Sequence, residues 1–130
     1  MHVTRRKPAH RDARGVIIDI LENDRVEAVT MLTSKKGTVR ANHYHKKTTQ
    51  YTYIVSGRVR VAEQRGNGRV ERRILKAGDL LTTPPWVKHA VEALADTVLI
   101  ACAHGPRRGK NYEDDTYRLE TPLIPARRRG

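Results

Sequence analysis

Two histidines stand two positions apart, at 43 and 45, in a segment that we predict to be a β-strand (residues 38–45). Side chains two positions apart on a strand point to the same face. Val39 and Ala41 share this parity, so we expect the histidine face to point into the core and Arg40 to point away from it. Because burying an imidazole is costly unless its ring nitrogens have partners, the pair indicates a functional site.

Two further polar residues extend this pair. Gln50 follows His45 by five residues, and His89 lies in a later alternating segment, with Val91 and Ala93 on its side. Three imidazoles and one amide suit a divalent transition metal, namely Zn, Fe, Mn, Ni or Cu. The same groups also suit a polar pocket for a ligand, or histidines that make their hydrogen bonds inside a barrel without any function. The residues alone leave these interpretations open.

Short apolar or alternating segments separated by Gly, Pro and Asn fill most of the chain, which is typical of a β-sandwich or small β-barrel. The chain has one Trp and no Phe, so Val, Ile, Leu and Ala must form the core. We predict an all-β protein with little helix, limited to a short helical turn after Pro106. The expected strands are residues 15–21, 26–33, 38–45, 50–56, 58–63, 70–75, 80–83, 88–94 and 97–103, with a hairpin turn at residues 65–68.

The net charge of +12 raises the question of nucleic acid. Much of the positive charge lies near the two ends, and no stacking aromatic residues alternate with it, as they do in single-strand binders. We therefore expect solvated basic tails and no nucleic-acid groove. The predicted organisation is a basic N-terminal arm that is disordered or loosely docked (residues 1–13), one domain (14–104), and a C-terminal segment with a basic tail (105–130).

The cellular location is also suggested by composition. Cys102 is the single cysteine, which fits a reducing compartment. No apolar run approaches the roughly 20 residues of a membrane span, and the basic N-terminus lacks the apolar middle of a signal peptide. We expect a cytoplasmic protein that does not contact a membrane.

Two motifs resemble the signatures of the cupin superfamily, and the resemblance covers about residues 15–103. The first, G-x5-H-x-H-x4-[E/Q]-x6-G, is filled by Gly37, His43, His45, Gln50 and Gly57. The second, G-x5-P-x-[G/W]-x2-H, is filled by Gly78, Pro84, Trp86 and His89. The resemblance implies a double-stranded β-helix (jelly roll) in which His43, His45, Gln50 and His89 coordinate one divalent cation. Most cupins have Glu at the position of Gln50 and Gly at that of Trp86.

A narrower likeness concerns the first motif. The pattern R-x-x-H-x-H-K-K-x-x-Q, which begins at Arg40, is similar to one in the dTDP-4-keto-6-deoxyhexose ketoisomerases, relatives in fold of the dTDP-4-dehydrorhamnose epimerases. Residues 111–119 also resemble the acidic, tyrosine-rich C-terminal segment of that family. There the paired histidines work without metal, and one moves a proton between neighbouring sugar carbons through an enediol. The likeness implies that His43 and His45 are catalytic.

Three functional hypotheses follow. The first is a metal-binding cupin enzyme of isomerase or epimerase type, acting on a carbohydrate or nucleotide-linked sugar. The second is a metal-dependent oxygenase of a small molecule, and the third is a ligand-binding, sensory cupin without turnover. For a sugar or phosphorylated substrate we expect binding by Arg40, Tyr53 and Trp86, with Trp86 at the barrel mouth beside His89. We also expect a homodimer, because apolar residues on both faces of residues 26–33 leave one face for a partner subunit.

Overall fold

The computed structural model describes residues 1–106 and 113–126, and in this part of the chain all regular structure is β-strand. The all-β prediction is therefore confirmed. The strands are, in chain order, β1 (His2–Arg5), β2 (His10–Asp12), β3 (Gly15–Ile17), β4 (Ala28–Ser34), β5 (Val39–Tyr44), β6 (Thr49–Ser56), β7 (Arg58–Arg65), β8 (Glu71–Lys76), β9 (Asp79–Thr83), β10 (Val87–Ala93), β11 (Thr97–His104) and β12 (Tyr117–Arg118).

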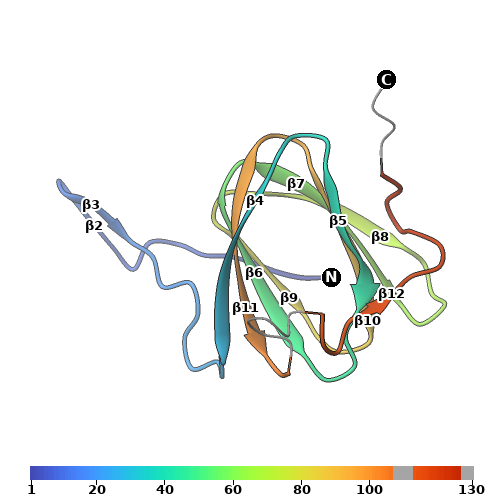
Figure 1. Cartoon of the computed structure of the whole chain (residues 1–130). Coiled ribbons are helices and arrows are strands. Elements are labelled where there is room, and N and C mark those ends of the chain that lie inside the picture. The colour runs from blue at the N-terminus through green and yellow to red at the C-terminus, as the bar shows by residue number, and fades with distance from the viewer. Residues whose placement is uncertain (107–112, 127–130) are drawn as a thin grey trace.

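Ten of these strands form two antiparallel sheets, in the orders β1-β9-β6-β11-β4 and β12-β5-β10-β7-β8, which enclose the barrel seen in Figure 1. Alternating apolar residues from both sheets meet inside, as a period of two requires. Each such buried side chain contributes about 1.5–3 kcal/mol of hydrophobic stabilisation. The core cluster consists of Ile54, Val59, Val61, Leu75, Leu81 and Leu99.

The turn between β6 and β7 shows why the first motif ends in glycine. Gly57 has a φ of 91°, in the left-handed region that glycine adopts without steric cost. A Cβ atom at this position would also collide with the Asp96 carbonyl and with Thr97. Any other residue would push β6 and β7 away from the start of β11.

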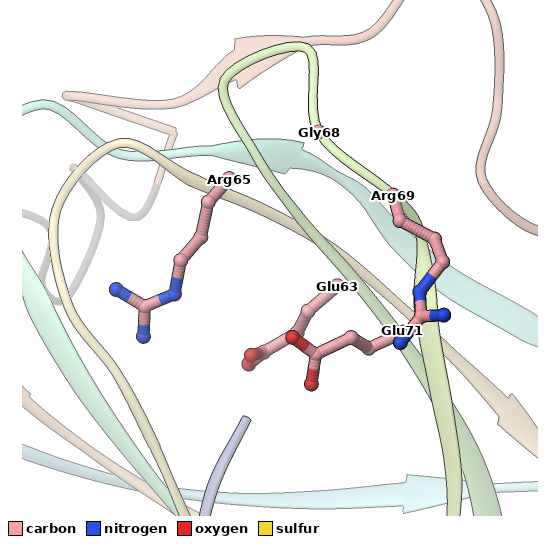
Figure 2. Close-up of a pocket in the computed structure, with 5 residues that line it drawn as sticks. All are labelled: Glu63, Arg65, Gly68, Arg69 and Glu71. Atoms are coloured by element: carbon pink, nitrogen blue, oxygen red, sulfur yellow. The ribbon is translucent and has the colours of Figure 1, made fainter.

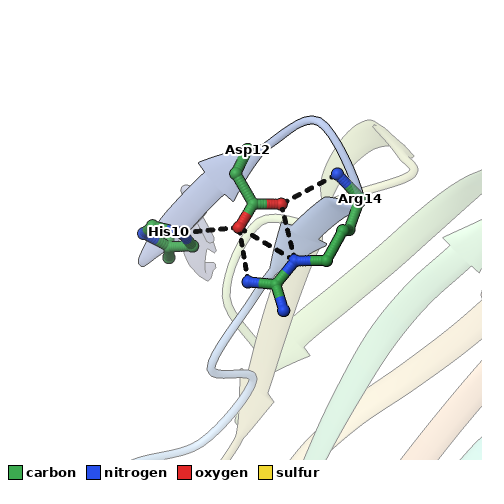
Figure 3. A network of polar contacts seen from close by, with 3 residues as sticks. All are labelled: His10, Asp12 and Arg14. Atoms are coloured by element: carbon green, nitrogen blue, oxygen red, sulfur yellow. Dashed lines mark hydrogen bonds and ion pairs between the residues drawn. The ribbon is translucent and has the colours of Figure 1, made fainter.

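The N-terminal region differs from the sequence-based expectation in two ways. Residues 2–5 form the edge strand β1 on β9, and Val3 packs against the core, so this part of the arm is firmly attached. The predicted strand 15–21 exists only as Gly15–Ile17, which pairs with β2 in a hairpin that projects from the barrel (Figure 1). In this hairpin Asp12 accepts hydrogen bonds from Arg14 and contacts His10 (Figure 3), and the Arg14 hydrogen bonds lower the pKa of Asp12 to about 2.

The C-terminal segment contributes a strand where a helical turn was expected. The described residues 113–126 contain no helix; Tyr117 and Arg118 instead pair with Tyr44 and His43 of β5. The basic residues Arg107, Arg108, Lys110, Arg127, Arg128 and Arg129 lie outside the described residues. Within the described ranges, no helix could cross a membrane.

Candidate functional site

A row of polar side chains crosses the inside of the second sheet. The strand register pairs His43 with His89, His89 with Glu63, and Glu63 with Glu71, from β5 through β10 and β7 to β8. Directly paired residues project to the same face of a sheet, and His89 and Glu63 are only 2% and 3% exposed. We call these four residues the polar row. One half is histidine and the other half is glutamate.

His45 joins the histidine half from the loop that follows β5. Its ring centroid lies 4.8 Å from that of His43 and 5.4 Å from that of His89, while the His43 and His89 centroids lie 4.7 Å apart. One ligand nitrogen from each of the three rings falls within 4.8 Å of the others. The fold therefore brings the side chains of His43, His45 and His89 together, as the sequence predicts.

Backbone carbonyls orient two of these rings. His89 Nδ1 lies 3.0 Å from the Val87 carbonyl oxygen, and His45 Nδ1 lies 2.9 Å from the Asp115 carbonyl oxygen. Since a carbonyl oxygen can only accept, Nδ1 is the donor in both rings, and the lone pair of the neutral imidazole is on Nε2. Such carbonyl contacts are the usual second shell of metal-binding histidines.

This donor set fits a divalent transition metal. Zn–N bonds of about 2.0–2.1 Å place tetrahedral ligand nitrogens roughly 3.4 Å apart, and the three imidazole nitrogens, all within 4.8 Å of one another, reach that spacing by closing up by at most about 1.4 Å. Neutral nitrogen ligands suit Zn, Fe, Mn, Ni and Cu better than Mg or Ca. The imidazoles that would hold the ion are those of His43, His45 and His89, and the amide of Gln50 lines the same cavity.

His43 and His89 face a cavity of about 360 Å³ between the two sheets. Gln50 also lines it, and its Nε2 donates to Thr52 Oγ1 at 3.1 Å. The mouth of the cavity has one positive and one negative side chain, Arg118 and Glu113, which form an ion pair at 3.1 Å. The lining residues are Leu32, Val39, Arg40, Ala41, His43, Gln50, Thr52, His89, Val91, Leu99, Ala101, Glu113, Thr116 and Arg118.

The expected outward direction of Arg40 is wrong. Ala41 and Asn42 have φ values of 71° and 56°, and the β5–β10 register skips Asn42, so β5 contains a bulge. An extra residue reverses the alternation on one side of it. Arg40 thus pairs with the inward-facing Val91, while Val39 pairs with Glu92 and packs against Ala90 and Ile124. The Arg40 guanidinium reaches Ser34 Oγ at 2.8 Å, at the edge of the cavity.

Two other expected substrate contacts lie elsewhere. Tyr53 pairs with Ile100 and Leu80, on the face of β6 opposite to the core residue Ile54. It is not among the cavity residues. Trp86 is 59% exposed and does not plug the barrel mouth. Its ring stacks on Tyr44 with centroids 5.8 Å apart, outside the cavity. Neither Tyr53 nor Trp86 belongs to the residues that line this cavity, and their contact with a substrate stays a prediction.

Sequence reasoning missed two acidic residues. Glu63 lies next to His89 in the polar row and faces a second cavity, of about 300 Å³, with Arg65, Arg69 and Glu71 (Figure 2). Burial raises the pKa of Glu63. In the sequence, residues 58–63 alternate as in an ordinary strand. The one signal for a buried Glu63 is that it stands two positions after Val61 and four after Val59, which both face inward.

The second is Asp115, which lies in the C-terminal segment and binds the loop after His45. Burial acts to raise the pKa of its carboxyl, but hydrogen bonds from Lys47, Thr48 and Lys46 outweigh burial and lower it. No local pattern identifies such a residue, because its partners lie about 70 positions away in the sequence.

Comparisons with known proteins agree with this architecture. In solved structures, the fold is similar to the TDP-quinovose 3,4-ketoisomerase of Campylobacter jejuni, with a TM-score of 0.77 and 17% identity over 91% of this chain and 92% of that one. It is also similar to a 3,4-ketoisomerase of Helicobacter canadensis (TM-score 0.76, 17% identity, 91% and 90% covered). A third is the dTDP-4-dehydrorhamnose 3,5-epimerase of Sulfolobus tokodaii (0.68, 22%, 77% and 68%).

At these identities the structural similarity establishes the fold, and a search of curated proteins finds no match. The profile of the cupin domain matches residues 30–102, which include both histidine-bearing motifs and more than half of the chain. The chain belongs to the cupin family.

Proposed function

We propose that the protein is an isomerase or epimerase that moves a proton between carbons of a nucleotide-linked keto sugar. The observation that carries this proposal is the convergence of three imidazoles, two of which face a cavity of about 360 Å³. Two of the similar structures named above, the TDP-quinovose 3,4-ketoisomerase and the dTDP-4-dehydrorhamnose 3,5-epimerase, support the substrate class.

The cavity residues have complementary roles in this reaction. His43 lines the cavity, and an imidazole with a pKa near neutrality can both take and return a proton. His45 packs beside the His43 ring, at a centroid distance of 4.8 Å. Arg40 and Arg118 at the cavity edge supply positive charge for an enediolate oxygen or a phosphate group.

We further propose that His43, His45 and His89, together with Gln50, hold one divalent cation. A bound cation would add positive charge beside the developing oxyanion. A ring nitrogen that binds a cation cannot accept a proton, so His43 acts as the base only in protein without the cation, and the metal content decides between the two roles of His43. Elemental analysis of protein purified without chelators or a nickel column measures it directly.

Deuterium exchange tests the reaction class. In D₂O the protein should introduce deuterium at the carbons next to the keto group of a TDP-4-keto-6-deoxyhexose, as mass spectrometry would show. His43→Ala should abolish the exchange, whereas Tyr53→Phe, on the opposite face of β6, should not. Failure of the wild-type protein to exchange deuterium with such substrates, and to be stabilised by them in thermal unfolding, would contradict the proposed function.

We also propose that the protein is a homodimer that associates through β4. This strand forms the edge of its sheet, and its outward side chains Val29 and Met31 are 69% and 72% exposed. Exposed apolar patches of this kind mark interaction surfaces. Sedimentation velocity should find a dimer in the wild-type protein and a monomer in Met31→Glu; a wild-type monomer at micromolar concentration would refute the interface.

A further inference from the structure

Asp115 connects the C-terminal segment to the loop that carries His45. Its carboxylate accepts hydrogen bonds from the backbone N–H groups of Lys46 (3.0 Å), Lys47 (2.9 Å) and Thr48 (2.8 Å), and from Thr48 Oγ1 (2.8 Å). Three successive N–H groups around one carboxylate form an anion-binding nest. The nest fixes the backbone of the loop immediately after His45.

The main chain of Asp115 acts on His45 itself. Asp115 adopts a left-handed conformation with a φ of 57°, and its carbonyl oxygen lies 2.9 Å from His45 Nδ1. This contact makes Nδ1 the donor and Nε2 the basic nitrogen. On the other side, Trp86 N donates to the His45 carbonyl at 2.6 Å. Both the backbone and the ring of His45 are thus held by residues distant in sequence.

The same residue sets the position of one cavity wall. Glu113 and Thr116, which flank Asp115, line the cavity, and so does Arg118 of β12. β12 pairs with β5, where Arg118 lies opposite His43, and the two strands run side by side in Figure 1. The carboxylate in its nest therefore fixes the segment that closes the cavity.

We propose that Asp115 is the positioning residue of the histidine cluster: it sets the tautomer and orientation of His45 and does not itself line the cavity. The expected effect on cation affinity rests on the cation site proposed above. The effect on the His45 tautomer does not depend on that site.

Asp115→Gly is the decisive variant. Glycine keeps the carbonyl and tolerates the left-handed backbone, so it removes only the carboxylate that locks the loop. In the wild-type protein, ¹⁵N NMR should show neutral His45 protonated at Nδ1. In Asp115→Gly the His45 ring should populate both tautomers. The dissociation constant for Co²⁺ should rise by about 10–100-fold, as it does when other residues that orient a metal ligand are removed.

Two further variants complete the test. Asp115→Asn keeps only one of the two acceptor oxygens, so its effect should have the same direction and be smaller; it decides the question if the glycine variant does not fold. Asp12→Ala is the matched control, because Asp12 also accepts several hydrogen bonds, including one from Arg14 N at 2.9 Å, but lies on the projecting hairpin (Figure 3).

The outcomes separate the two proposals. If the folded Asp115 variants keep the wild-type tautomer, and Co²⁺ affinity within twofold of the wild type, the positioning role is overturned. If the wild-type protein binds no Co²⁺, the cation site is overturned, and the NMR comparison alone then decides the role of Asp115.

Discussion

The two halves of the polar row occupy equivalent positions in neighbouring strands and yet present different chemistry. His43 and His89 face a cavity edged by Arg40 and Arg118, and they are accompanied by His45. Glu63 and Glu71 face the second cavity, where Glu71 binds the Met1 amino group at 2.9 Å and Thr83 Oγ1 lies 3.5 Å from Glu63.

The difference lies in what the surroundings do to each group. In the histidine half, backbone carbonyls fix the orientation of the His45 and His89 rings. In the glutamate half, burial raises the pKa of Glu63, whereas the hydrogen bond and charge of the Met1 amino group lower that of Glu71. One barrel layer thus holds a histidine cluster and an acidic pair side by side, because each half has its own hydrogen-bond and charge partners.

The largest expected effect is in the histidine half. His45→Ala should abolish metal uptake and leave the β fold intact. Loss of a residue that only orients a metal ligand lowers metal affinity by about 10–100-fold, and loss of the ligand itself should lower it further. Glu71→Gln, in the other half, should keep the wild-type metal content. Elemental analysis and circular dichroism measure both. Full metal content in His45→Ala would show that the assigned ligand set is wrong.

Below the polar row, the apolar core should determine stability without affecting the site. Leu75 is 1% exposed, and Leu75→Ala should reduce the free energy of unfolding by about 2–5 kcal/mol through lost burial and an internal cavity. Urea denaturation measures the change. A decrease in the free energy of unfolding of less than about 1 kcal/mol would mean that neighbouring side chains move to fill the space left by the Leu75 side chain.

The glutamate half should make stability depend on pH. Since the pKa of Glu63 is raised in the folded protein from its ordinary value of 4.5, the folded state binds the proton more tightly than the unfolded state. The contribution of Glu63 is therefore fully present below pH 4.5 and is lost as the pH rises through the folded-state pKa. Glu63→Gln should flatten this decline in melting temperature. Parallel pH profiles of the two proteins would contradict the assignment.

The smallest effect is expected at Trp86, which lies outside the cavity. Trp86 has a φ of 72°, and Trp86→Gly should relieve about 1–2 kcal/mol of left-handed strain while losing about 0.5–1.5 kcal/mol of ring stacking on Tyr44. The melting temperature should hardly change, and metal content should not change at all. A loss of metal in this variant would place Trp86 within the site.

The strands of the barrel could be predicted because each carries its own evidence. The alternation in residues 58–63, the Asn-Gly turn at 67–68 and the two prolines after Thr83 are local signals, and β7, β8 and β9 follow them closely. The strand predicted at residues 15–21 is too long, because a short apolar run does not show which part of the protein it packs against. In the structure, it pairs only with β2 in the hairpin.

The candidate site could be predicted in part. Spacing within two motifs identified His43, His45 and His89, and the alternation of β10 correctly gave the inward face of His89. The alternation of β5 failed for Arg40, because the bulge at Asn42 depends on two left-handed residues that sequence alone does not mark. Tyr53 is buried on the face of β6 opposite to the cavity, and its residue type alone does not reveal this register.

By itself, the sequence determined an all-β cupin domain and three histidines that belong together, since strand periodicity and motif spacing are properties of short stretches. Only the tertiary structure decided which way Arg40 points, that Glu63 lies beside His89, and that Asp115 holds His45. These outcomes depend on cross-strand register and on hydrogen bonds between residues up to 70 positions apart. Such contacts form only when the whole chain has folded.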